Sequence, residues 1–375
     1  MVTSLRVSRK RISSENKEEI SNQQDPSKNL QDVINNSYFL NKNKNLQFIP
    51  SGSSLLDLVL GGGWPIGRMV NIIGDSSTGK SLLAIEACAN CKLKFPNTKI
   101  YYFEAESAFD KDYAEALGMP IDDIEFPSES LENLTIESWY SHLESVIDNS
   151  ISEKTESEPI LYILDSLDAL SDEAELDRKI TDNSYGMAKQ KKLGELFRRL
   201  INKMGKVNLT LIIISQVRAN IGVTFGEKLS RSGGKAMDFY ASICLWLTQI
   251  AKLKKTINGK ERIYGVTIKS LCKKNKVSLP YRECQFPIIF GYGIDDFTSC
   301  YEWATEGLNK EQLINFHEEL NGSTYSTNAG FLKSIDSLTS DEFLIVKNKL
   351  IEIVRQTWFV IEQAFLPKQK KYPLV

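Results

Sequence analysis

A glycine-rich segment carries the clearest chemical signal in the chain. Residues 74–81 read Gly-Asp-Ser-Ser-Thr-Gly-Lys-Ser, the complete spacing of a phosphate-binding loop. Its backbone N–H groups would cradle phosphate oxygens, Lys80 would supply a cation to the β and γ phosphates, and the Ser81 hydroxyl would hold Mg²⁺. A glycine turn before an ordinary helix is the alternative, but an apolar run precedes the segment and a helix-forming stretch follows it. We therefore predict a nucleoside triphosphate site. The predicted contacts are Gly74, Asp75, Ser76, Ser77, Thr78, Gly79, Lys80, Ser81 and Leu82.

Carboxylates close two of the other apolar runs in the chain. Asp165 ends one run, where it could hold Mg²⁺ together with Ser81. Glu104 and Glu106 end another, and one of them could orient and deprotonate the water that attacks the γ phosphate. We assign this role to Glu106 and keep Glu104 as the fallback, because spacing alone does not say which side chain faces the nucleotide.

A glutamine and a basic loop follow a further apolar run. Gln216 could donate to the γ phosphate and report its loss to the segment that follows. Residues 217–237 are glycine-rich and hold four cations against Glu227, which gives a net charge of +3. A solvated surface loop is the alternative, but beside a γ-phosphate sensor this segment is a candidate for ATP-controlled binding of a phosphate backbone. The four cations are Arg218, Lys228, Arg231 and Lys235.

The elements that must position these residues are near-continuous apolar runs separated by helical stretches. Such runs predict an α/β fold, in which a mostly parallel central sheet is covered by helices on both faces. Between two runs, apolar residues recur at helical spacing from Leu193 to Met204 and predict an amphipathic covering helix. The runs are 69–73, 99–103, 160–164, 209–214 and 243–248.

Composition narrows the class of protein. The 375 residues include 46 Lys and Arg against 48 Asp and Glu, a net charge of -2, so any nucleic-acid surface must be local. No apolar run approaches the roughly 18 residues that span a bilayer, and no apolar signal segment follows the basic N-terminus. We expect a cytoplasmic protein with no membrane partner. Cys88 and Cys91 form a C-x-x-C pair within an apolar predicted helix, so packing explains them better than redox or zinc chemistry.

The pattern of composition predicts four parts along the chain. The first is too polar to repay the entropy of ordering, and the last contains a helix with a capping box at Thr339 and Glu342. The parts are a flexible N-terminal arm (1–30), a helix and extended segment (31–50), which is our candidate for an oligomerisation segment, an ATPase core (51–295), and a small α-rich C-terminal domain with a basic tail (296–375).

Taken in their order along the chain, these motifs resemble those of the RecA family of strand-exchange ATPases. The lead-in at 51–68 looks like the family's approach to its phosphate loop, and residues 104–110 are similar to its catalytic-glutamate motif. Residues 183–187 resemble its first DNA-binding loop, and 215–236 its second. The match covers about residues 48–295. Ser215 departs from the Asp or Asn that family members commonly carry there, and the chain ends in a basic rather than an acidic tail.

The resemblance implies roles for particular residues. Tyr113 would stack on adenine, with Asp110 beside it in the nucleotide site. Lys274 and Lys276 would reach across a subunit interface to the ATP of the neighbour. The implied DNA-binding residues are Tyr185, Gly186, Arg218, Asn220, Ile221, Gly222, Lys228, Arg231, Gly233, Gly234 and Lys235.

The resemblance also implies an activity and its partners. We expect a DNA-dependent ATPase with a RecA-like P-loop core, using ATP and Mg²⁺, that assembles as a helical homo-oligomer on single-stranded DNA and pairs it with homologous double-stranded DNA. Single-stranded-DNA-binding or loader proteins could assist. A ring-forming DNA helicase or translocase on the same core is one alternative, and a non-catalytic ATP-binding regulator of recombination is another.

Overall fold

The computed structural model describes residues 46–154, 158–176, 186–219, 229–231 and 234–367. The predicted N-terminal arm lies outside the described residues, and of the predicted oligomerisation segment only the last five residues are described. The division into four parts therefore stays a prediction. Among the described residues, no helix is both long and apolar enough to cross a bilayer.

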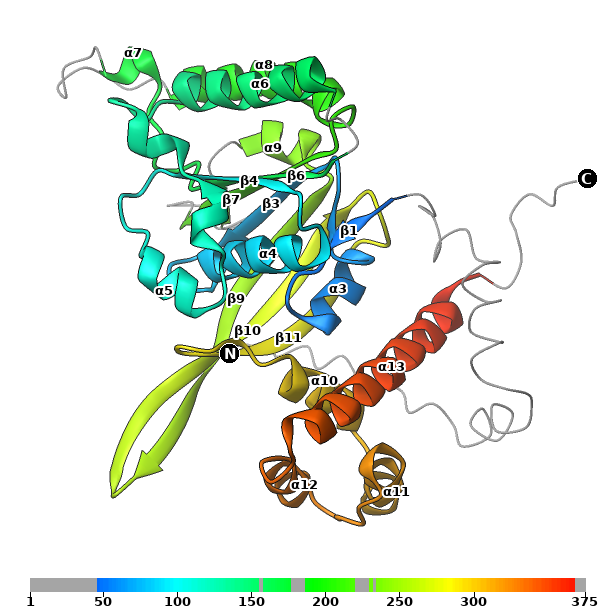
Figure 1. Cartoon of the computed structure of the whole chain (residues 1–375). Coiled ribbons are helices and arrows are strands. Elements are labelled where there is room, and N and C mark those ends of the chain that lie inside the picture. Colours follow the sequence, from blue (N-terminus) through cyan, green and yellow to red (C-terminus); the bar gives the residue numbers. More distant parts are fainter. Residues whose placement is uncertain (1–45, 155–157, 177–185, 220–228, 232–233, 368–375) are drawn as a thin grey trace, which may run out of the picture.

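A large mixed sheet forms the centre of the described structure (Figure 1). Its strand order is β12-β11-β10-β9-β3-β7-β6-β4-β5, with β8 paired to β7 beside this path. The strands from β9 to β5 pair in parallel, whereas β9 to β12 pair antiparallel. The strands are β3 (Met69–Gly74), β4 (Lys99–Glu104), β5 (Ile124–Glu125), β6 (Ile160–Asp165), β7 (Leu209–Ala219), β8 (Leu229–Arg231), β9 (Ile243–Ile257), β10 (Lys260–Asn275), β11 (Arg282–Ile289) and β12 (Gly293–Ile294).

Helices cover both faces of the parallel strands, as the sequence predicts. Figure 1 places α3 and α4 on one side of the sheet and α6 and α8 on the other, and a separate hydrophobic cluster fills each interface. Leu193, Phe197, Leu200 and Met204 are buried on α8, which confirms the amphipathic covering helix. The helices are α3 (Ser54–Leu60), α4 (Lys80–Lys94), α5 (Lys111–Ala116), α6 (Ile136–Glu153), α7 (Glu173–Leu176), α8 (Gly186–Met204) and α9 (Gly234–Tyr240).

Short elements complete the core. A small antiparallel pair, β1 with β2, precedes the central sheet in the chain, and two single turns of 3-10 helix flank β5. Cys88 and Cys91 are buried free thiols on α4, which agrees with a packing role. The elements are β1 (Phe48–Ile49), β2 (Trp64–Pro65), and the 3-10 turns Ile121–Asp123 and Pro127–Ser130.

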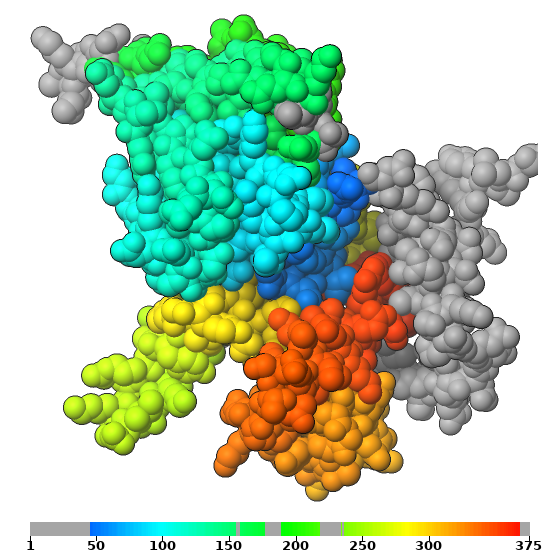
Figure 2. All heavy atoms as spheres, in the orientation of Figure 1, coloured from blue at the N-terminus to red at the C-terminus, as the bar shows by residue number. Residues whose placement is uncertain are grey.

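A long hairpin of β9 and β10 projects well beyond the rest of the sheet (Figures 1 and 2). Its turn is formed by Asn258 and Gly259, both at positive φ (52° and 73°), as a two-residue turn between twisted antiparallel strands requires. The predicted apolar run ended at residue 248, so the sequence interpretation missed the outer half of β9. That half is exposed on both faces, and it therefore lacks the apolar pattern that marks a buried strand.

The C-terminal helices form a lobe beside the core, coloured orange to red in Figure 2. The predicted capping box is confirmed: Thr339 accepts from the backbone of Glu342, and the Glu342 side chain accepts from the Thr339 N–H. The lobe is tied to the core by Asp296, whose carboxylate accepts hydrogen bonds from the N–H and hydroxyl of Ser54 at 2.6 and 2.9 Å. The helices are α10 (Asp296–Thr305), α11 (Lys310–Asn321), α12 (Asn328–Ile335) and α13 (Ser340–Phe365).

Candidate nucleotide site

The predicted phosphate loop joins β3 to α4 at the carboxyl edge of the parallel strands. Gly79 turns the chain into the helix with φ of 81° and ψ of 19°, a conformation that side chains other than glycine rarely adopt. A Cβ on Gly74 would lie 2.4 Å from the Thr78 hydroxyl oxygen, so this position is also restricted to glycine. The tight loop followed by a helix N-terminus is the geometry that presents backbone N–H groups to phosphate.

Lys80 lies over its own loop. Its ammonium group donates to the carbonyl of Asp75 at 2.7 Å, and the side chain is almost entirely buried. Burial lowers the pKa of Lys80, although the nearby carboxylates of Asp165 and Glu106 oppose this effect. A buried cation beside a phosphate-binding loop suits the binding of a polyanion, because the negative charge of the ligand would compensate for the hydration that the cation has lost.

Asp165 and Ser81 come together from β6 and α4. Their side chains are hydrogen-bonded, and the Asp165 carboxylate also accepts from the Tyr102 hydroxyl at 2.8 Å. Burial raises the pKa of Asp165, and these two hydrogen bonds to the charged form oppose that effect. One hydroxyl and one carboxylate suit Mg²⁺, which is commonly bound by one or two protein oxygens together with substrate phosphates. The pair therefore fits the predicted metal role.

Glu106 lies at the centre of a second group of side chains at this edge. Its Oε1 accepts from the Ser166 hydroxyl at 2.5 Å and from the Gln216 amide at 3.0 Å. The Gln216 backbone N–H in turn donates to the Asp168 carboxylate at 2.7 Å. Because β4, β6 and β7 are neighbours, their carboxyl ends bring these residues together from three separate segments.

Glu104, the fallback for the same role, has a different position. Its carboxylate accepts backbone N–H groups of Glu106, Ser107 and Ala108 at 2.8, 3.0 and 3.2 Å. These bonds fix the turn that follows β4 and use much of the acceptor capacity of the carboxylate. The arrangement favours Glu106 as the group available for chemistry.

Asp110 and Tyr113 lie at the start of α5. The Asp110 side chain caps the helix by accepting from the Tyr113 N–H at 3.0 Å. The Tyr113 side chain is 43% exposed, which leaves its ring accessible for the stacking role that we expect. The structure thus gives Asp110 a local capping function, and its contact with the nucleotide stays a prediction.

Comparison with known proteins identifies the relationships of this chain. A family model described as the RecA N-terminal domain matches residues 37–295. This chain belongs to the RecA family. Its RecA relatives include Protein RecA of Gloeothece citriformis, 34% identical over 69% of this chain and 68% of the relative, and Protein RecA of Porphyromonas gingivalis, 36% identical over 67% and 69%. Protein RecA of Prochlorococcus marinus (strain MIT 9215) is 30% identical over 83% of this chain and 79% of its own length.

Family membership agrees with the α/β fold and its mostly parallel RecA-like core, which the structure confirms. RecA-family proteins are typically ATPases with roles in DNA recombination and repair, and this chain belongs to that family.

Lys274 lies on β10 and Lys276 follows that strand, and both side chains contact the C-terminal end of α9. The Lys274 ammonium donates to the carbonyls of Asp238 and Phe239, and the Lys276 ammonium donates to Phe239 at 3.2 Å. These are carbonyls of the last helical turn, where cations are favourable. Burial is the largest cause that lowers the pKa of Lys274, followed by the neighbouring charge of Lys276.

The predicted DNA-binding residues are only partly described. Arg218 is on β7 and Arg231 is on β8, and the register pairs Val217 with Arg231, so the two ends of the second loop meet as antiparallel strands. Gly186 begins α8 and Gly234, with Lys235 after it, begins α9. The other predicted contacts lie outside the described residues: Tyr185, Asn220, Ile221, Gly222, Lys228 and Gly233.

Sequence reasoning missed three residues of this RecA-family site. Ser166, Asp168 and Tyr102 contact Glu106, Gln216 and Asp165, respectively. A usable signal existed for Ser166 and Asp168, which follow Asp165 closely at a strand end. Tyr102 carried none, because it reads as an ordinary apolar strand residue.

Proposed function

We propose that this chain is a DNA-dependent ATPase recombinase, which forms ATP-dependent filaments on single-stranded DNA and promotes homologous pairing and strand exchange. The observation that carries the proposal is the hydrogen bond between Gln216 and Glu106. It joins the candidate hydrolytic carboxylate to the strand that leads into the basic loop. Membership of the RecA family and its link with recombination support the same activity.

In hydrolysis, Glu106 would act as the base. It would orient a water molecule for in-line attack on the γ phosphate and take its proton, while Lys80 stabilises negative charge on the phosphate oxygens. Mg²⁺, held by Ser81 and Asp165, would neutralise charge on the β and γ phosphates. Ser166 donates to Glu106 and thereby fixes the carboxylate in one orientation.

Gln216 would couple hydrolysis to DNA binding. Its amide contacts Glu106 on one side, and its chain continues along β7 to Arg218 and the loop that returns as β8. A change in the γ phosphate that moves the Gln216 side chain would therefore move the base of the loop. Loop cations bind the phosphate backbone and not base edges, so this binding would be largely independent of sequence.

Assembly would place ATP between neighbouring protomers. Lys274 and Lys276 would contact the ATP of the next protomer, which makes the interface head-to-tail. Such a heterologous contact need not close, and repetition then produces a helical filament. In the filament, homology is read by base pairing between the bound strand and a homologous duplex.

The direct test is strand exchange by the purified chain with and without ATP. Exchange that requires ATP supports the proposal, and ATP hydrolysis without exchange refutes it. Binding of a labelled oligonucleotide should be tight with ATP and weak with ADP or no nucleotide, and equal binding in all three states would also refute it. Electron micrographs with DNA and ATP distinguish the open filaments that we expect from the closed rings of a helicase.

A further inference from the structure

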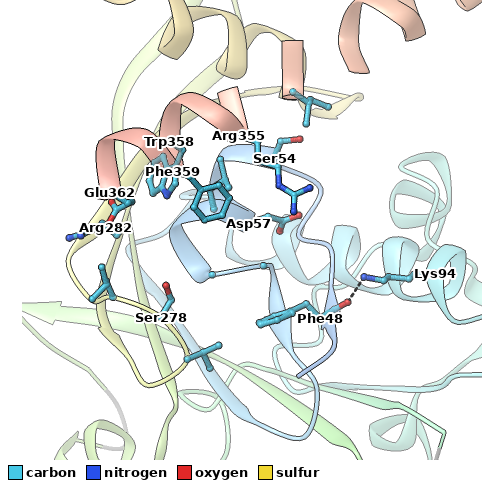
Figure 3. A pocket seen from close by; sticks show the side chains of 16 residues that line it. Phe48, Ser54, Asp57, Lys94, Ser278, Arg282, Arg355, Trp358, Phe359 and Glu362 are labelled. Carbon is cyan, nitrogen blue, oxygen red and sulfur yellow. Dashed lines mark hydrogen bonds and ion pairs between the residues drawn. The ribbon is translucent and has the colours of Figure 1, made fainter. Parts of the chain in front are cut away.

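A cavity of about 480 Å³ lies between the core and helix α13, and Figure 3 shows its lining. One wall is α13, with Arg355, Trp358 and Phe359. The facing wall is formed by α3, the turn after it, and the chain between β10 and β11, and Phe48 of β1 also lines the cavity. None of the residues assigned to the nucleotide site lines it. Cavities of this size at the junction of two structural units are common binding sites.

The α13 wall continues beyond the cavity. Ile351, Arg355, Trp358, Glu362 and Phe365 recur at the spacing that places residues on one face of a helix. The first four line the cavity, while Phe365 lies past it and is 78% exposed. At about 1.5 Å per residue, this face is about 21 Å long. A single small molecule would cover only part of it, whereas an extended peptide of about six residues would cover the whole length.

The cations around the cavity outweigh the anions. Lys94 approaches from α4 and donates to the Phe48 carbonyl at 2.9 Å, as the dashed line in Figure 3 marks. Arg355 approaches from α13 and has no hydrogen bond or ion pair with any described residue. Arg282 donates to Glu362 at 2.5 Å, and these two charges compensate each other. The remaining pair, Lys94 and Arg355, favours an anionic occupant.

Two further features of the cavity lining favour an anionic occupant. The buried Nε of Arg282 has no hydrogen-bond partner among the described residues, so one donor at the cavity wall is available for an acceptor. Burial raises the pKa of Asp57, the other carboxyl of the lining, to about 7. The group is therefore partly protonated at neutral pH, which weakens its opposition to an anion.

We propose that this groove docks an acidic linear peptide of a partner protein, one that carries a single aromatic side chain. The aromatic ring packs against Phe48 and Phe359 in the cavity, and the peptide carboxylates bind Lys94 and Arg355. The apolar contact with Phe365 extends the interface along α13. Charge complementarity and the length of the face together select an acidic peptide over a small ligand. The inference does not depend on the recombinase activity.

The test is fluorescence anisotropy of a labelled peptide of Asp and Glu residues around a single Phe, titrated with the full chain. We expect saturable binding that weakens with added salt and is about tenfold weaker for Arg355→Glu. Lys252→Glu makes the same charge change at an exposed position on β9, so it should bind the peptide as the unmodified chain does. Equal binding by Arg355→Glu, or no saturable binding by the unmodified chain, overturns the proposal.

Matched peptides and a second variant separate charge from packing. Replacing the peptide Phe with Ala, or Phe365 of the chain with Ser, should weaken binding several-fold, because each removes buried apolar surface. A peptide with Lys in place of its acidic residues should not bind, and binding as tight as that of the acidic peptide overturns the proposal. The proposal is also overturned if the acidic peptide fails to bind while a labelled oligonucleotide or a small aromatic phosphate binds in a way that depends on Arg355. Arg355 and Phe365 are exposed, so folding of both variants is expected and is checked by circular dichroism.

Discussion

The nucleotide site and the groove beside α13 each contain a carboxyl group whose pKa is raised by burial, but they are built differently. At the nucleotide site Asp165 is one member of a hydrogen-bonded group in which Tyr102 and Ser81 contact it directly. In the groove Asp57 accepts from the Ser51 N–H, whereas Arg355 has no polar partner among the described residues. Hydrogen bonds hold the side chains of the nucleotide site in fixed positions, which suits catalysis. In the groove a cation is left without a polar contact, which suits the binding of a charged partner.

The largest expected effect is the loss of activity in one region while the other region keeps its activity. Lys80→Ala should abolish ATP hydrolysis, because it removes the cation that stabilises the phosphate oxygens, and it should leave acidic-peptide binding unchanged. Arg355→Glu should weaken peptide binding about tenfold and leave ATP hydrolysis unchanged. Phosphate release and peptide anisotropy on the same preparations measure both effects. A variant that impaired both activities in a folded protein would show that the two regions are coupled.

The next effect tests the assignment within the nucleotide site. Glu106→Gln should keep ATP binding and slow turnover by on the order of a hundredfold or more, since the amide cannot accept the water proton. Its control is Glu104→Gln, which should mainly loosen the turn after β4. Unchanged turnover in Glu106→Gln would transfer the catalytic role to Glu104.

The basic loop should give the binding of single-stranded DNA a steep dependence on salt concentration. If its four cations each contact a phosphate, the slope of log affinity against log salt for single-stranded DNA would be roughly -3 per protomer, at about 0.7 per contact. Measuring isolated, weakly cooperative binding of a short oligonucleotide at several salt concentrations gives this slope. A value near zero would argue against the loop as the DNA contact.

The prediction with the smallest expected effect on either activity concerns the groove and the pH dependence of stability. Because the folded pKa of Asp57 is raised from its usual value of 3.8 to about 7, the folded state holds a proton that the unfolded state loses between those values. Stability should therefore fall as pH rises from about 4 to 7 and then level off. Asp57→Asn should remove this contribution, which is on the order of a few kcal/mol at neutral pH, at about 1.4 kcal/mol for each unit of pKa. Thermal unfolding of both proteins at pH 5 and pH 8 measures it, and identical pH dependence would contradict the assignment.

The sequence predicted much of the nucleotide site but nothing of the groove. The phosphate loop and the strand-end residues Asp165, Glu106 and Gln216 were identifiable because each is marked by a local pattern, an apolar run followed by a polar group. Their mutual contacts were not identifiable, because they depend on the order β4-β6-β7 of strands that are far apart in the chain. Tyr102 was missed because it lies within an apolar strand, where nothing in the sequence marks it as a contact of Asp165.

The groove had no local pattern at all. Its lining comes from positions between Phe48 and Glu362, and only tertiary packing brings them together. The outer hairpin was missed for a different physical reason. Neither face of it is buried, so no hydrophobic periodicity distinguished the strands there, and only the Asn258 and Gly259 turn could have indicated it.

The resting position of Lys274 and Lys276 has a thermodynamic consequence. Their ammonium groups cap the carbonyl end of α9, so a lysine that extends to a phosphate of an adjoining protomer gives up a bond to Asp238 or Phe239. The uncapped last turn of α9 is then easier to fray. In the proposed filament, assembly and the order of this short helix would therefore be linked equilibria, so that any change that stabilises the helix would shift the tendency of the protomers to join.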